Sequence, residues 1–386
     1  MIRMLRVRIS RKGNLLTHER GRVDFSDMNV DTIYDSRHIT QMLDELGQPA
    51  FRTQQVLEWI WNRGITSYDE MTNVPVQVRD ALASQIPLLR PCITDTQHSQ
   101  DGTRKYLMQF ADGAIVEVVG LPSKDRLTVC ASTQIGCAMG CTFCATGQGG
   151  FVRNLTAAEI ADTVVLVGRD FDRRVANVVM MGQGEPFANY DETLEAMRIM
   201  NAPWGLGIGA RHITVSTAGV LSGIKRLSSE PEQYTLAVSL HSAVQTTRDT
   251  LMPGLATQKL DELKAVLMDY YEKTGRRPSL EYTLIAGKSD TPSEVEALGS
   301  FAAAVGAHVN LIPLNQWGFV SGKSDNELSS THISEAGRII PTSDHRAREI
   351  ALFLRNRYGV EATVRKRRGA DIDAACGQLR TRHVSQ

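Results

Sequence analysis

Three cysteines lie close together in the stretch IGCAMGCTFCATGQGG, which covers residues 135–150. Cys137, Cys141 and Cys144 follow a C-x3-C-x2-C spacing. Thiolates at such short spacing bind zinc or an iron–sulfur cluster, and both kinds of site normally take four protein ligands. The first question is therefore why a metal site would be built with only three.

Three kinds of metal site are open for this cysteine run. A structural zinc would need a fourth ligand, such as His241 or Cys130, but no second C-x2-C pair is present. An electron-transfer [4Fe–4S] cluster would need a fourth cysteine at local spacing. We favour a [4Fe–4S] cluster whose fourth iron is left open for a small molecule. S-adenosylmethionine can chelate such an iron, and electron transfer to its sulfonium then produces a carbon radical.

The composition of the 386-residue chain is that of an ordinary globular protein, with 42% hydrophobic and 22% charged residues. No apolar run is long enough to span a membrane, and the basic N-terminus lacks the apolar core of a signal peptide. These features predict a cytoplasmic protein without a membrane partner. The formal net charge is zero, but basic residues gather in residues 1–23 and in RKRR, residues 365–368. They fit either solvated surfaces or local contacts to a phosphate backbone.

Hydrophobic periodicity divides the chain into five parts. We expect a basic, disordered extension over residues 1–35, a helical accessory domain over 36–92 and a β-hairpin linker over 93–122. Strand and helix patterns then alternate over residues 123–358, which predicts a parallel sheet in either a partial barrel or a doubly wound fold. Residues 359–386 form a C-terminal segment. Cys92 is expected to be a small buried hydrophobe.

Polar residues recur where the predicted parallel strands end. The cysteine run follows the first strand of the α/β part, GQGEP at 182–186 follows the second, and Ser216 ends the third. SLH at 239–241 ends the next strand, and Asn315 follows the last of the six. Chemistry in parallel α/β folds gathers at the carboxyl ends of the strands. We therefore expect these residues on one edge of the sheet.

The order of motifs along the chain resembles one protein family. GCAMGCTFCATG, GGFVRNLTAAEI, NVVMMGQGEP, SLHS, NLIPLN and RKRRGADIDAACGQL together are similar to the RlmN/Cfr family of radical S-adenosylmethionine adenine methyltransferases, with RlmN as its nearer branch. The resemblance covers about residues 36–380. It implies an α/β fold, namely a partial (β/α)6 radical-SAM barrel with a small helical N-terminal accessory domain and a C-terminal extension.

The same resemblance implies roles for two isolated cysteines and a glutamate. Cys376 matches the residue that first accepts a methyl group and carries it as S-methylcysteine. Cys130 matches the resolving thiol, which releases the covalent protein–RNA adduct and forms a transient disulfide with Cys376. Glu117 matches the proton acceptor. Two molecules of S-adenosylmethionine are then used per turnover, one as the methyl donor and one as the radical source.

The resemblance also implies the ligands of the cofactors. Cys137, Cys141 and Cys144 would hold a [4Fe–4S] cluster with one open iron. The residues that would contact S-adenosylmethionine are Gly184, Glu185, Ser216, Ser239, Leu240, His241 and Asn315.

The implied substrate is an adenosine in the peptidyl-transferase region of 23S rRNA, methylated at C2. Methylation at C8, as in the Cfr branch, is the alternative, and an adenosine of the tRNA anticodon loop is a further candidate substrate. An electron donor such as flavodoxin or ferredoxin is expected, and the enzyme is expected to be a monomer. Two rivals from other classes are a radical enzyme with another outcome, such as methylthiolation, and a non-catalytic cluster protein that binds RNA. The second would leave Cys130 and Cys376 without a role.

Overall fold

The structure, a computed structural model, describes residues 36–315 and 340–379. The extension expected over residues 1–35 and the last seven residues of the expected C-terminal segment lie outside the described residues. Among the helices that are described, none is long and apolar enough to cross a membrane.

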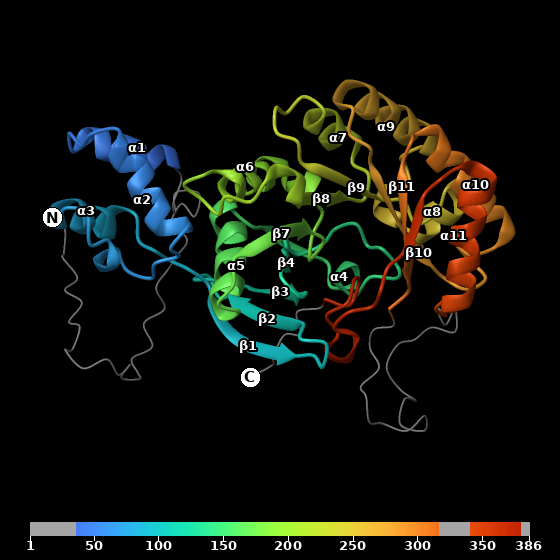
Figure 1. The fold of residues 1–386 in the computed structure, drawn as a ribbon, viewed down its shortest axis with the longest axis horizontal. Helices are drawn as coiled ribbons and strands as arrows, with labels where there is room; N and C mark the ends of the chain where they lie inside the picture. Colours follow the sequence, from blue (N-terminus) through green and yellow to red (C-terminus); the bar gives the residue numbers. More distant parts are fainter. Residues whose placement is uncertain (1–35, 316–339, 380–386) are drawn as a thin grey trace. The chain divides into compact units, whose positions relative to one another are not determined.

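One sheet of ten strands organises the described residues, in the order β1-β2-β3-β4-β7-β8-β9-β10-β11-β12 (Figure 1). From β4 to β12 each strand is parallel to its neighbour. Their spatial order follows their order in the chain, whereas a doubly wound sheet would reverse direction at a switch point. The arrangement confirms the predicted α/β fold of the partial-barrel type. The parallel strands are β4 (Leu127–Cys130), β7 (Val175–Met180), β8 (Ile213–Thr217), β9 (Thr235–Ser239), β10 (Ser279–Leu284), β11 (His308–Pro313) and β12 (Ala362–Val364).

Helices connect successive parallel strands and lie along the outer side of the sheet (Figure 1). The first of them begins with a capping box, in which the Thr156 hydroxyl accepts from the Glu159 amide at 3.2 Å and the Glu159 side chain accepts from the Thr156 amide. Because these connecting helices lie on the outer side, the carboxyl ends of the strands are free to form a site on the inner side. The connecting helices are α5 (Ala157–Asp170), α6 (Tyr190–Asn201), α7 (Leu221–Leu227), α8 (Gln245–Leu251), α9 (Leu260–Thr274), α10 (Pro292–Ala304) and α11 (Asp344–Tyr358).

Residues before the sheet form the expected helical region, with α1 (Ser36–Glu45), α2 (Phe51–Trp61) and α3 (Val76–Gln85). Trp59 and Trp61 of α2 are both buried. Arg90, just after this region, forms a buried ion pair with Asp162 of α5. An apolar core and a buried ion pair therefore join the helical region to the α/β part.

The hairpin predicted before the α/β part has a third strand. Strands β1 (Cys92–His98), β2 (Arg104–Gln109) and β3 (Ile115–Pro122) are antiparallel, and β3 pairs with β4, so they extend the main sheet. Cys92 is exposed on β1, so its expected burial was wrong. The domain boundaries at residues 92, 122 and 358 stay predictions, because the described residues 36–315 and 340–379 belong to one compact unit.

Candidate active site

The cysteine run forms a loop between β5 (Gln134–Gly136) and α4 (Ala145–Gln148), on the inner side of the sheet. Its backbone is fixed at several points. The Cys137 amide donates to the Gly150 carbonyl at 2.8 Å, and the Thr142 amide donates to the Leu251 carbonyl at 3.0 Å. Contacts from two other segments thus hold the thiols in place.

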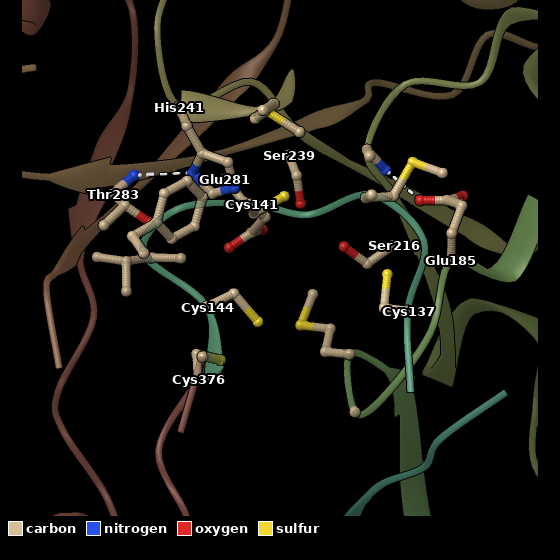
Figure 2. A pocket seen from close by; sticks show the side chains of 18 of the residues that line it. Cys137, Cys141, Cys144, Glu185, Ser216, Ser239, His241, Glu281, Thr283 and Cys376 are labelled. Atoms are coloured by element: carbon tan, nitrogen blue, oxygen red, sulfur yellow. Dashed lines mark hydrogen bonds between the residues drawn. The ribbon is translucent and has the colours of Figure 1, made fainter. Parts of the chain in front are cut away.

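Side chains of the three cysteines point into one cavity, which Figure 2 shows from close by. Burial raises the pKa of Cys137 to about 11 and also raises the pKa of Cys141, so ionising these thiols requires a strong positive partner. A bound metal provides such a partner, since coordinated thiols are deprotonated. Among the described residues, no group of three His, Cys, Asp or Glu side chains is arranged around a single ion. The donor set fits a cluster that separates its ligands better than it fits one zinc ion.

The turn after β7 brings a carboxylate to the cavity wall. Gly184 has φ +103°, and a Cβ atom there would lie 2.6 Å from Cβ of Gln134, so glycine allows the turn to lie against β5. The Glu185 carboxylate accepts from the Thr217 hydroxyl and the Ala218 amide, both at 2.6 Å. Burial raises the pKa of Glu185, whereas these hydrogen bonds oppose the shift. A further cation in the cavity would favour its ionised form.

Strand β9 brings Ser239 and His241 to the same cavity, beside Ser216 of β8 (Figure 2). Nδ1 of His241 accepts from the Thr283 amide at 3.1 Å, which leaves Nε2 as the N–H donor of the neutral ring. Burial first, and then the charge of Arg248, lower the pKa of His241 to about 3. His241 is therefore a neutral hydrogen-bond donor at neutral pH.

The C-terminal segment completes the cavity with Cys376. Nδ2 of Asn315, directly after β11, donates to the Cys376 carbonyl at 3.2 Å. The Ala145 amide, next to Cys144, donates to the Gly377 carbonyl at 2.7 Å. Two residues more than 230 positions apart in the chain, Cys144 and Cys376, thus line one cavity.

Cys130 lies at the end of β4 and lines a second cavity. Cys376 and Asn315 line both cavities, and the second is also lined by the four basic residues Arg365–Arg368. Burial raises the pKa of Cys130 to about 12, a thiolate at Cys376 adds to this shift, and the charge of Arg365 opposes it. Arg365 thus interacts electrostatically with both isolated cysteines.

The structure does not bring two of the expected residues to these cavities. Glu117 is buried on β3, where its carboxylate lies 3.6 Å from Nζ of Lys105, and it lines neither cavity. The Lys105 ammonium also donates to the Asp373 carbonyl at 3.3 Å. Leu240 is fully buried in the core, and only its neighbours Ser239 and His241 reach the first cavity. The remaining expected residues line one or both cavities.

Sequence analysis did not single out Glu281, a buried carboxylate on the wall of the first cavity. Its Oε1 accepts from Nδ2 of Asn310 at 2.8 Å, and its Oε2 lies 3.8 Å from Nη1 of Arg365. The signal was a single acidic residue inside the apolar strand LEYTLI. A charge in a buried strand is costly without a partner, so it indicates a polar neighbour across the fold.

Comparison with known proteins defines the class first. Residues 132–301 match the radical SAM superfamily, whose members use a [4Fe–4S] cluster and S-adenosylmethionine. A crystal structure of a radical SAM methyltransferase from Sphaerobacter thermophilus superposes with a TM-score of 0.80 at 39% identity, covering 90% of this chain and 98% of that one. The fold is therefore that of a radical SAM enzyme.

Relatives narrow the class further. Residues 33–87 match the ribosomal RNA large subunit methyltransferase N-terminal domain. A protein of Symbiobacterium thermophilum named "Probable dual-specificity RNA methyltransferase RlmN" is 40% identical, over 95% of this chain and 94% of the relative. A protein of the same name from Thermosynechococcus vestitus is 42% identical, over 86% of this chain and 93% of the relative. The chain belongs to the RlmN family of radical SAM RNA methyltransferases, as its motifs predicted.

Proposed function

We propose that this enzyme methylates C2 of an adenosine in the peptidyl-transferase region of 23S rRNA, and that an adenosine of a tRNA anticodon loop is a second substrate. The position of Cys376 carries the proposal. This residue lines the cavity of the three clustered cysteines and also the cavity that holds Cys130 and four basic residues. A thiol at such a junction is able to accept a methyl group on one side and present it to a nucleotide on the other.

The cofactor assignments rest on the lining of the first cavity. A [4Fe–4S] cluster with one open iron, held by the three clustered cysteines, would supply with S-adenosylmethionine both a methyl group and a carbon radical. Two molecules of S-adenosylmethionine are consumed in each turnover. Glu185 would accept from the ammonium of the cofactor, and neutral His241 would donate through Nε2. The further proposed contacts are Gly184, Ser216, Ser239, Leu240 and Asn315, of which Leu240 would contribute backbone atoms alone.

Cys376 and Cys130 have complementary roles in this proposal. Cys376 would carry the methyl group as a thioether, and loss of a hydrogen atom from this group to the carbon radical leaves a thiomethylene radical that adds to the ring carbon. The ring proton is then lost together with one electron, which would return to the cluster, so that a closed-shell thioether links Cys376 to the adenine. Release requires cleavage of the sulfur–carbon bond of the linkage. The Cys130 thiolate forms a sulfur–sulfur bond with Cys376, and the electron pair of the broken bond stays with the product carbon, which takes up a proton. The resulting disulfide must be reduced before the next turnover.

Glu117 is proposed as the base that removes the adenine ring proton, but its place on β3 sets a condition. The carboxylate pairs with Lys105, and neither side chain lines the first or the second cavity. The Lys105 ammonium also contacts the backbone of Asp373, three residues before Cys376. The role therefore requires that RNA binding displaces residues near Asp373 and opens a path between Glu117 and the second cavity.

The proposal of an RNA substrate draws on the charge of the second cavity. Arg365–Arg368 line it, and the exposed side chains of Lys366 and Arg367 are available to a phosphate backbone. The names of the relatives describe those proteins as RNA methyltransferases. We further propose a flavodoxin or ferredoxin as electron donor, a monomeric enzyme and a cytoplasmic location, where RNA and reduced thiols are both found.

The test is single-turnover methylation of 23S rRNA fragments and of tRNA by anaerobically reconstituted enzyme, with the modified base mapped by mass spectrometry. We expect methyl-Cys376 in the protein before RNA is added and 2-methyladenosine in the RNA afterwards. Cys130→Ala should retain methyl-Cys376 and accumulate protein crosslinked to RNA, because no thiol remains to attack the sulfur of Cys376 and release the RNA. Cys92→Ala is the matched control, since Cys92 is exposed on β1, and it should release product normally.

Each part of the proposal has a separate contrary result. Free product at the wild-type rate from Cys130→Ala would remove the resolving role. A methyl group at C8 of the adenosine would show the activity of the Cfr branch instead. Bound zinc, or a cluster whose spectrum is unchanged by S-adenosylmethionine, would refute the open-iron site.

A further inference from the structure

Arg248 of α8 is a buried arginine with no acidic partner within 4.0 Å among the described residues. The residue is only 1% exposed. Nη2 donates to the Ala218 carbonyl at 2.7 Å, but Nε has no hydrogen-bond partner among the groups that the structure describes. Arg90, another buried arginine, is instead paired with Asp162. Arg248 therefore lacks the close ionic partner that buried arginines normally have, and its favourable interactions, with Cys141 first and then Asp249, act at longer range.

The segment that carries Arg248 is attached to the cysteine loop. The Thr142 amide donates to the Leu251 carbonyl, and the Gly254 amide donates to the Met139 carbonyl, both at 3.0 Å. Leu251 also packs in an apolar group with Phe143 and the clustered cysteines Cys141 and Cys144. Arg248 lies less than one helical turn before Leu251, and its charge interacts with Cys141.

Two buried charged side chains contact the backbone of one residue, Ala218. The Ala218 amide donates to Glu185, and the Ala218 carbonyl accepts from Arg248. Glu185 faces the cavity where a cationic cofactor group is proposed to bind, whereas Arg248 does not line that cavity. The guanidinium thus lies outside the lining of the cavity proposed for the cofactor, and its charge interacts with Cys141 of the cysteine loop.

We propose that Arg248 is the buried counter-charge of the [4Fe–4S] cluster and makes its reduction easier. A cluster with three protein thiolates carries a net negative charge, and reduction adds one more unit. A fixed positive charge in a medium of low dielectric constant stabilises the reduced form more than the oxidised form. The inference rests on the proposed cluster site and is independent of which RNA is methylated.

The first experiment is a redox titration of the full chain with its reconstituted cluster, followed by electron paramagnetic resonance. Arg248→Met keeps the length of the side chain and removes the charge. We expect the ratio of reduced to oxidised cluster at a given potential to fall at least about tenfold, equal to about 59 mV for one electron. Arg248→Lys should lie close to the wild type. Arg276→Met is the control, because Arg276 also donates to backbone carbonyls, those of Glu232 and Tyr234, and should leave the ratio unchanged.

A second readout covers a variant that fails to bind the cluster. If Arg248 is an uncompensated charge without the cluster, Arg248→Met should not lower the melting temperature of the cluster-free protein. The same change should reduce the gain in melting temperature on cluster loading. Equal losses in both forms, or an unchanged redox ratio, would overturn the proposal. Wild-type protein that takes up no cluster would instead refute the site on which it rests.

Discussion

Replacement of Gly184 by alanine tests whether the turn after β7 must lie against β5 as the structure has it. Gly184 has φ +103°, and an added Cβ atom would lie 2.6 Å from Cβ and 2.8 Å from the amide nitrogen of Gln134. A positive φ costs a residue with a Cβ atom about 1–2 kcal/mol. Overpacking in a tight contact adds about 1–3 kcal/mol. We therefore expect Gly184→Ala to lower the free energy of unfolding by about 2–5 kcal/mol.

The loss should be visible in thermal unfolding of the cluster-loaded protein. An unfolding entropy of about 2.1 cal/mol/K per residue gives about 0.8 kcal/mol per degree for this chain, so the expected fall in melting temperature is about 3–6 °C. The substitution also separates the Glu185 amide from Oε1 of Gln134, now 2.8 Å apart. Binding of S-adenosylmethionine, measured by equilibrium dialysis, should weaken more than tenfold, because Glu185 moves with the turn.

Gly287→Ala is the matched control for this experiment. Gly287 also has a positive φ, +70°, but no atom of the residues that the structure describes lies within 4 Å of an added Cβ. Only backbone strain remains, so the expected fall in melting temperature is about 1–3 °C, with cofactor binding unchanged. Equal falls for the two variants would refute the argument that contact with Gln134 requires glycine. Unchanged cofactor binding by Gly184→Ala would refute the role of this turn in the site.

Two further predictions concern buried groups. Burial raises the pKa of Cys130 to about 12, so its thiolate fraction should rise about tenfold per pH unit across pH 7–9. The rate of alkylation of Cys130 in cluster-loaded protein, measured by peptide mass spectrometry, should rise by the same factor without a plateau. A plateau near pH 8.5 would contradict the raised pKa. Asp162→Asn removes the charge partner of buried Arg90 and should lower the free energy of unfolding by about 3–5 kcal/mol in denaturant titrations. Combination with Arg90→Met should recover most of that loss, and a double variant as unstable as the single one would contradict the pairing.

The residues around the first cavity were predictable because they lie at the carboxyl ends of parallel strands in one sheet. Glu185, Ser216, His241 and Asn315 are spread over 131 positions, yet strand order alone brings them to one edge of the sheet. No side-chain detail was needed for this prediction. It required only that strand patterns and the polar residues after them be recognised in order.

Residues on antiparallel strands were less predictable, because their environment depends on register and on distant segments. Glu117 is paired with Leu107 across β2 and β3, and its charge partner Lys105 lies two positions farther along β2. The sequence offered no way to know that Lys105 would also contact Asp373. The exposure of Cys92 was missed for the same reason, since β1 is an edge strand that only pairing with β2 reveals.

Short strands beside the cluster loop were also missed, because they are held by contacts rather than by an alternating pattern. Strand β5 has three residues and β6 (Phe151–Asn154) has four. Their pairing lets the Cys137 amide reach the Gly150 carbonyl. The partners of this stretch come from the fold and not from a local pattern.

Contacts of the C-terminal segment imply that cluster loading and the position of Cys376 are linked. The amide that holds the Gly377 carbonyl belongs to Ala145, the residue directly after Cys144. The Thr146 hydroxyl donates to the Leu379 carbonyl at 2.7 Å. A shift of the cysteine loop on cluster loss would therefore move both contacts that flank Cys376. Because a methyl group can be transferred only to a thiol held near the donor, the proposed assignment implies that the loop which would hold the cluster also orders the residue which would accept the methyl group.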